Sequence, residues 1–309
     1  MMRGVPTGRF APSPTGPLHL GNLRTALVAW LFARSSGGRF LLRVEDLDPV
    51  TATRDKEAAQ LADLAALGLD WDGPVVRQSE RRAAHEAALD RLVAEGRTYP
   101  CWCSRREIRE AAAAPHAIPG VYPGTCRDLS EAERTERAAS GRPVALRLRA
   151  DGTEVEVVDR IRGPVRRRVD DVVLRRNDGV PAYNLAVVVD DAAQGVEEVV
   201  RGDDLLEVTP TQAHLCDLLG LPRPSWAHVP LVLGPDGARL AKRHGAVTLA
   251  ELAAAGIGPD EVRGRLAVSL GLAEPGEAVS ADDLVTRFDP ARLPREPWTP
   301  ELGELASGA

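Results

Sequence analysis

The sequence predicts an α/β fold built on a parallel sheet, and two observations carry this prediction. Up to about residue 95 the pattern reads strand, helix, strand, helix, helix, which is the order that crossover helices give to a parallel sheet. An acidic run, 45–48, directly follows the second predicted strand, where an open α/β sheet has its ligand crevice. The 309 residues allow one large domain or two smaller ones.

The stretch 9–22 combines a strand, a Pro/Gly loop and the start of a helix that continues over 23–33. Prolines fix the backbone of the loop, and Gly16 and Gly21 allow a ligand to approach the main chain. A helix N-terminus offers N–H groups and partial positive charge to an anion. We therefore expect a phosphate-binding turn, with His19 at the junction of loop and helix.

The next elements follow from apolar spacing and from glycines that suit helix ends. A buried strand is predicted at 39–44 and helices at 54–67 and 80–95. Beyond residue 99 the chain becomes rich in Gly, Pro and charge, and strands follow at 144–148, 154–158 and 171–175. The run Asn177-Asp178-Gly179 is a strong hairpin turn. These features predict that residues 99–178 are inserted into the sheet domain.

The second half returns to the pattern of the first. We predict strands at 182–189, 196–200 and 228–233, and a helix at 209–219. Two helices are expected within 247–272, and the Pro-rich segment after Asp289 is expected to be poorly ordered. The predicted division is a catalytic domain at 1–98 and 179–245, the insertion at 99–178, and a short helical part at 246–309.

Composition restricts the class of protein. The chain is 44% hydrophobic and 27% charged, as in soluble enzymes, and it has neither a signal-peptide pattern nor an apolar run of membrane-spanning length. We expect a cytoplasmic protein and, since no dimer face is evident, a monomer. The net charge of -6 argues against indiscriminate nucleic-acid binding but allows local RNA contacts. The basic run 160–168 fits such a contact and fits equally an edge strand protected by charge.

Three of the four cysteines are clustered with a tyrosine: Cys101-x-Cys103, then Tyr122 and Cys126. Three thiolates and a phenolate would suit a tetrahedral zinc ion. The spacing alone does not decide between a zinc site and ordinary reduced thiols. Cys216, among apolar residues of a predicted helix, is expected to be a core residue.

Several motifs, in order and at matching spacing, resemble the glutamate branch of class I aminoacyl-tRNA synthetases. They are 12–26 (PSPTGPLHLGNLRTA), 43–48 (RVEDLD), 183–191 (YNLA with VDD), 201–205 (RGDDL) and 239–243 (RLAKR). The resemblance covers residues 8–245 and implies a Rossmann-like nucleotide-binding catalytic domain. Such enzymes join a carboxylate to ATP by placing cations and donors where charge develops on the phosphates.

Only about 65 residues follow Arg243, fewer than the anticodon-binding domains of a full glutamyl-tRNA synthetase require. The chain thus resembles the glutamyl-Q tRNA(Asp) synthetase family. That resemblance implies tRNA-independent activation of L-glutamate with ATP, then transfer of the glutamyl group to queuosine in tRNA(Asp). The alternatives are a short glutamyl-tRNA synthetase that charges tRNA(Glu) and a non-catalytic RNA-binding paralogue.

The same resemblance implies roles for individual residues. Catalytic roles fall to His19 and Lys242. The glutamate site would consist of Arg9, Ser13, Glu45, Tyr183 and Arg201, and the ATP site of His19, Gly21, Asn22, Arg239, Lys242 and Arg243. It also favours one structural Zn²⁺ on Cys101, Cys103, Tyr122 and Cys126, and Mg²⁺ with ATP. Three positions depart from the class I signatures: Asn22 replaces a histidine, Ala241 replaces a serine, and Arg239 replaces a leading lysine.

Overall fold

The structure is a computed structural model that describes residues 5–112, 121–240, 244 and 247–300. Its main feature is a seven-stranded sheet with the strand order β3-β2-β1-β9-β10-β6-β7. All neighbours pair in parallel except β6 and β7, which are antiparallel. The strands are β1 Gly8–Phe10, β2 Phe40–Val44, β3 Val76–Arg77, β9 Glu198–Gly202, β10 Ser225–Val229, β6 Glu154–Asp159 and β7 Gly163–Arg168. The predicted parallel α/β sheet is confirmed.

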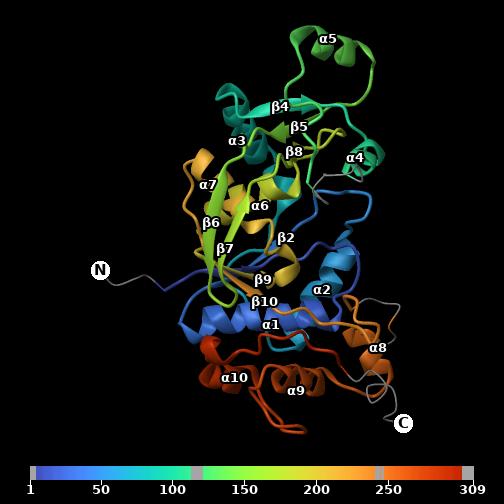
Figure 1. The fold of residues 1–309 in the computed structure, drawn as a ribbon. Helices are drawn as coiled ribbons and strands as arrows, with labels where there is room; N and C mark the ends of the chain where they lie inside the picture. The colour runs from blue at the N-terminus through green and yellow to red at the C-terminus, as the bar shows by residue number, and fades with distance from the viewer. Residues whose placement is uncertain (1–4, 113–120, 241–243, 245–246, 301–309) are drawn as a thin grey trace.

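A second, antiparallel sheet of three strands has the order β4-β5-β8. It lies with the short helices α4 and α5 at the end of the molecule opposite the C-terminal helices (Figure 1). The bounds are β4 Thr98–Cys101, β5 Ala145–Leu148, β8 Val173–Arg175, α4 Arg105–Ala112 and α5 Glu131–Ala139. The insertion is therefore not built on one sheet, because β6 and β7 extend the large one. The division of the chain at 98, 178 and 245 stays a prediction.

Helices cover both faces of the large sheet (Figure 1). Since successive strand residues point to opposite faces, Phe40 and Leu42 pack with α1 and the C-terminal helices, and Leu41 packs against α3, α6 and α7. In the same way, Val200 packs on the α1 side of the sheet and Val199 packs on the α3, α6 and α7 side. These helices are α1 Leu20–Ser35, α2 Arg54–Ala66, α3 Arg82–Ala94, α6 Tyr183–Ala193, α7 Thr209–Leu218, α8 Leu249–Ala254, α9 Pro259–Ser269 and α10 Ala281–Arg287. The central strands β1, β2, β9 and β10 are buried on both faces, as in parallel sheets covered by helices, whereas β6 alternates exposed and buried residues.

The segment predicted as a strand at 182–189 is instead the start of helix α6, Tyr183–Ala193. A short apolar run fits a buried strand and a buried helix equally well. What decides is length, because the run continues through Asp190, Asp191 and two alanines to Gly195, whose φ of 66° ends the helix. On this helix Asp190 accepts a hydrogen bond from Gln78 (2.9 Å), and Asp191 pairs with Arg9 and Arg43, as described below.

The tail prediction was wrong up to residue 300. Pro290–Arg292 forms a 3₁₀ turn, Leu293 is buried, and Trp298 pairs with Val232 beside the end of β10. The burial of Leu293 and the partial burial of Trp298 against the core supply the ordering that composition did not predict. Residues 301–309 lie outside the described part of the chain.

Other boundaries shift slightly. β10 begins at Ser225 and ends at Val229, ahead of Pro230, where a strand was predicted at 228–233. The basic run 160–168 contains β7, an edge strand of the large sheet. On it, Arg166 pairs with Glu154 (2.8 Å) and Arg167 with Glu207. These contacts fit the edge-strand interpretation, and an RNA contact there stays a prediction.

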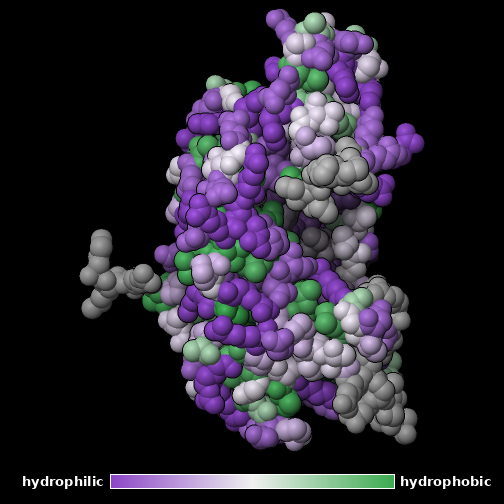
Figure 2. All heavy atoms as spheres, in the orientation of Figure 1, coloured by the Kyte–Doolittle hydropathy of each residue, from purple (hydrophilic) through white to green (hydrophobic). Residues whose placement is uncertain are grey.

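The visible face in Figure 2 is mainly hydrophilic. Large exposed apolar side chains in the described chain are isolated ones: Val5, Val50, Val93, Val121 and Val158. Among the described residues, no helix combines the length and apolar character needed to cross a bilayer.

Candidate active site

A cavity of ≈ 620 Å³ opens where β1, β2, β9 and β10 end and where α1 and α6 begin. This is the crevice in which an open parallel sheet binds its ligands. Its lining contains every described residue that was predicted for glutamate or ATP: Arg9, Ser13, His19, Gly21, Asn22, Glu45, Tyr183, Arg201 and Arg239. Lys242, Arg243 and Ala241 lie outside the described residues. Segments far apart in sequence thus form one site.

Arg9 is held by Asp191 at the end of α6. Its Nε and Nη2 each lie 3.2 Å from a carboxylate oxygen of Asp191, and Arg43 reaches the same carboxylate at 2.5 Å. Burial disfavours the charged form of Asp191, but Arg43 and Arg9 outweigh it and hold the pKa of Asp191 below its ordinary value. Arg9 is therefore an oriented but compensated cation.

Arg201, at the end of β9, is buried without a carboxylate partner in the described part of the chain. Its Nε donates to His228 Nε2 (3.0 Å), and its Nη atoms donate to Tyr183 Oη (3.3 Å) and Thr209 Oγ1 (2.9 Å). All three acceptors are neutral groups. Burial lowers the pKa of Arg201, yet a guanidinium stays protonated at neutral pH. The cavity thus contains a fixed positive charge available to an anion.

Glu45 follows β2 and lies 3.5 Å from Arg43 Nη2, with a side chain only 12% exposed. Burial raises the pKa of Glu45, while Arg43 and Arg9 work against that rise. Its backbone N–H donates to Pro12 O (3.0 Å), so the end of β2 is tied to the opening loop. This places a carboxylate in the same cavity as Arg201.

His19 is the N-cap of α1. Its Nδ1 accepts hydrogen bonds from the backbone N–H groups of Gly21 (3.1 Å) and Asn22 (3.3 Å). Burial, with a further contribution from Arg239, lowers the pKa of His19 to about 4. The ring is consequently neutral, and because Nδ1 is an acceptor its proton lies on Nε2. His19 can donate that proton in a hydrogen bond to an anion.

The first N–H groups of α1 are not free, contrary to expectation. Leu20 N donates to Val247 O (2.8 Å), and those of Gly21 and Asn22 are taken by the His19 ring. A Cβ at Gly21 would lie 2.9 Å from His19 Cε1, so glycine here makes room for the ring. The Asn22 side chain in turn accepts from His19 N (3.3 Å), which completes a capping box. Asn22, where the class I signature has histidine, thus stabilises the helix start.

Arg239 enters the site from a hairpin that turns at 234–237. Leu240 N donates to Val232 O (2.9 Å) across the hairpin, and Gly237 has a φ of 73° at its tip. Arg239 Nη1 lies 2.5 Å from Asp204 Oδ2, just after β9. The Arg239 side chain is 54% exposed, so it can exchange Asp204 for another anion.

Four polar residues that support the site were not predicted. Gln60 on α2 donates to Ser13 O (3.1 Å) and Gly16 O (2.6 Å) and so holds the opening loop. Asp191 anchors Arg9, and the pair His228 and Asp159 supports Arg201. The available signal was a polar residue inside an otherwise apolar run, as at His228 between Ala227 and Val229. That signal predicts burial with a partner but does not identify the partner.

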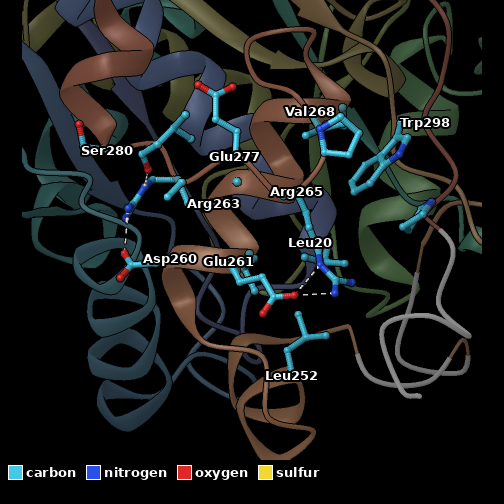
Figure 3. A pocket seen from close by; sticks show the side chains of 18 of the residues that line it. Leu20, Leu252, Asp260, Glu261, Arg263, Arg265, Val268, Glu277, Ser280 and Trp298 are labelled. Carbon is cyan, nitrogen blue, oxygen red and sulfur yellow. Dashed lines mark hydrogen bonds and ion pairs between the residues drawn. The ribbon is translucent and has the colours of Figure 1, made fainter. Parts of the chain in front are cut away.

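A larger cavity of ≈ 1130 Å³ lies among the C-terminal helices (Figure 3). Its charged side chains pair locally: Arg265 with Glu261 (2.6 Å) and Arg263 with Asp260 (2.8 Å). Glu277 pairs with Arg287 (2.8 Å). With these charges compensated, the C-terminal cavity does not offer the fixed charge that the crevice does.

The predicted metal ligands converge in the part of the chain that carries the β4-β5-β8 sheet, which we call the small domain. The sulfur atoms of Cys101, Cys103 and Cys126 all lie within 4.8 Å of one another, and Cys103 and Cys126 are 3.6 Å apart. Tyr122 Oη lies 3.4 Å from Cys101 Sγ and 3.5 Å from Cys103 Sγ. Tetrahedral zinc with Zn–S bonds of about 2.3 Å requires sulfur atoms about 3.8 Å apart. The donor set therefore fits zinc. Cys216 is a buried core residue, as predicted.

The family model and the known proteins described here all belong to tRNA synthetases or tRNA ligases. The family described as "tRNA synthetases class I (E and Q), catalytic domain" matches residues 5–300. A glutamyl-Q tRNA(Asp) synthetase of Nocardia farcinica is 66% identical over 292 residues, which cover 94% of this chain and 92% of that protein. One from Symbiobacterium thermophilum is 52% identical over 304 residues, 94% of each chain. A solved glutamate tRNA ligase of Elizabethkingia meningosepticum is 28% identical with a TM-score of 0.83, over 97% of this chain and 68% of that one.

The parallel sheet, its crevice and the match over 5–300 define the catalytic domain of a class I tRNA synthetase of the E and Q type. The relatives narrow this class further. The chain belongs to the glutamyl-Q tRNA(Asp) synthetase family and is an enzyme, a ligase.

Proposed function

We propose that this enzyme activates L-glutamate with ATP in the absence of tRNA and then transfers the glutamyl group to queuosine in the anticodon of tRNA(Asp). In the first step an oxygen of the α-carboxylate attacks the α-phosphorus of ATP, and pyrophosphate leaves. In the second, a hydroxyl of queuosine attacks the carbonyl carbon of glutamyl-adenylate, and AMP leaves with the formation of an ester. Neither step requires a protein nucleophile, so positioning and charge supply the catalysis.

The observation that carries this proposal is the buried, uncompensated Arg201 in the crevice. A fixed guanidinium in a partly desolvated cavity favours a carboxylate over its neutral amide. In the proposal Arg201 and Tyr183 bind the side-chain carboxylate of glutamate. Glu45 receives the ammonium group, and Arg9 and Ser13 line the remainder of the amino acid site.

The ATP side of the proposal rests on His19 and Arg239. The Nε2–H of neutral His19 donates to a phosphate oxygen, and Arg239 exchanges Asp204 for phosphate. Lys242, Arg243 and the neighbourhood of Gly21 and Asn22 complete the ATP site as predicted from the motifs. Mg²⁺ on the phosphates would offset the charge that develops as pyrophosphate leaves.

The acceptor is tested by glutamylation of three RNAs: tRNA(Asp) with queuosine, tRNA(Asp) lacking it, and tRNA(Glu). We expect radioactive glutamate to appear only on tRNA(Asp) with queuosine, because the proposed acceptor hydroxyl belongs to that nucleoside. Label on tRNA(Asp) without queuosine would contradict the proposed acceptor. Label on tRNA(Glu) would favour the alternative, a short glutamyl-tRNA synthetase.

For the small domain we propose one structural Zn²⁺ on Cys101, Cys103, Tyr122 and Cys126. The support is the convergence of three sulfurs and one phenol oxygen from separate segments. Bound there, the ion would tie the turn after β4 to residues 122–126. A cluster with so few apolar side chains around it gains stability from such a link.

Replacement of Cys103 by serine is expected to remove zinc and loosen the small domain, because one thiolate ligand is lost. Metal analysis of the purified variant should fall from one zinc per chain to a small fraction, with faster proteolysis between residues 99 and 148. The matched control is Cys216→Ser, since Cys216 lies in the core away from the cluster. Full zinc content in Cys103→Ser would refute the ligand set.

A further inference from the structure

The support of Arg201 extends two residues behind the cavity. His228 on β10 accepts the hydrogen bond from Arg201 Nε at its Nε2, and its Nδ1 lies 2.6 Å from Asp159 Oδ2 at the end of β6. The side chains of His228 and Asp159 are completely buried. Three adjacent strands of the large sheet thus contribute one residue each to a line that ends at the cavity.

The hydrogen bonds fix the direction of this line. Asp159 also accepts from the backbone N–H groups of His228 (3.1 Å), Ile161 (2.9 Å) and Arg162 (2.8 Å), which stabilise its ionised form. An ionised Asp159 is only an acceptor, so the proton of His228 lies on Nδ1 and the lone pair on Nε2 faces Arg201. Burial lowers the pKa of His228 and keeps the ring neutral. Arg201 is therefore held by a neutral acceptor.

Two other arginines of this chain are held differently from Arg201. Arg9 and Arg43, which lie near the same cavity, are held directly by the carboxylate of Asp191. A carboxylate in direct contact neutralises a guanidinium and competes with any incoming anion. With His228 placed between Arg201 and Asp159, the orientation of Arg201 is retained while the carboxylate of Asp159 contacts the imidazole ring and not the guanidinium.

We propose that His228, itself oriented by Asp159, is a positioning residue that holds Arg201 while leaving its charge available, and thereby makes the cavity selective for a carboxylate side chain over its amide. This inference rests on the proposed function, since it assigns the side-chain carboxylate of glutamate to Arg201. It adds a residue that touches neither substrate. Tyr183, Thr209 and the carbonyl oxygen of Leu205 (3.4 Å) are further neutral acceptors around the guanidinium.

Three replacements of His228 separate orientation from charge. His228→Gln retains a neutral acceptor, His228→Leu removes the acceptor, and His228→Glu puts a carboxylate against Arg201. The measurement is glutamate-dependent ATP–pyrophosphate exchange, with KM and kcat for glutamate and for glutamine. We expect KM for glutamate within about threefold of the unmodified enzyme in His228→Gln, and raised roughly tenfold or more in the other two, as for loss of a buried charged hydrogen bond.

The pattern across the variants distinguishes positioning from general damage. KM for ATP should stay constant, and His228→Glu should lose most of the preference for glutamate over glutamine. The control is His214→Leu, a half-buried histidine on α7 outside the cavity lining. If His228→Glu does not fold, the comparison of KM for glutamate between His228→Gln and His228→Leu still tests the inference.

Equal KM for glutamate in His228→Gln and His228→Leu would overturn the inference. So would a drop in kcat with an unchanged glutamate KM in every folded variant. Failure of the proposed function looks different, because the unmodified enzyme would then show no exchange with glutamate at all.

Discussion

Replacement of Arg201 by alanine is expected to lower kcat/KM for glutamate in the exchange reaction by about 100-fold or more, the usual effect of breaking a buried charge pair. The side chain is 6% exposed, and its guanidinium is fixed by three neutral acceptors inside the crevice. Without it, a substrate carboxylate would enter a cavity whose two other lining arginines are already paired, Arg9 with Asp191 and Arg239 with Asp204. Exchange kinetics at varied glutamate, with glutamine as competitor, measure the effect.

The same variant should lose discrimination, because the energetic difference between a carboxylate and an amide depends on that charge. Its control is Arg223→Ala, which removes an exposed arginine paired with Asp217 and should change kcat/KM very little. A melting curve shows whether each variant is folded. An Arg201→Ala enzyme that still prefers glutamate to glutamine as strongly as before would refute the assigned role.

Replacement of His19 by alanine is expected to lower kcat for exchange roughly 100-fold, in line with loss of one preorganised donor at a developing charge. The residue has two tasks, since Nδ1 caps α1 and the Nε2–H faces outward from the cap. His19→Ala removes both and should also cost about 1 kcal/mol of stability through the lost cap.

His19→Asn separates the two tasks. Asparagine is a good N-cap residue but lacks the ring that carries the second nitrogen. We expect the asparagine variant to recover the melting temperature of the unmodified enzyme while its exchange rate stays as low as that of His19→Ala. Recovery of the rate by asparagine would show that capping, rather than donation to phosphate, is what His19 supplies.

Most of the fold follows from local patterns. Buried strands such as β2 and helices such as α1 and α7 were predicted because apolar runs and glycine stops mark them in the sequence. The exceptions have a common cause. Helix α6 and the ordered segment up to residue 300 both make contacts with distant partners: Asp191 with Arg9 and Arg43, and Trp298 with Val232. Such contacts join residues far apart in sequence.

In the site, too, some features could be predicted from the sequence and others could not. The motifs identified residues that line one cavity, because four of them lie at the end of a strand or the start of a helix and Arg239 of the fifth lies in a hairpin beside them. They did not show that the α1 N–H groups are already bonded, since this depends on the tautomer of His19 and on Val247. Nor did they identify the partner of Arg201, which belongs to another strand. Residue types can be assigned from sequence, whereas their pairing requires the fold.

In the proposed function the crevice activates glutamate without any tRNA. The most direct test of this activation is ATP–pyrophosphate exchange with purified enzyme, Mg²⁺, ATP and pyrophosphate, run with glutamate, with glutamine and with no amino acid, and without any tRNA. We predict robust exchange with glutamate and only background with the other two. Exchange with glutamate that appears only after tRNA is added would contradict tRNA-independent activation, and no exchange under either condition would contradict the proposed activity.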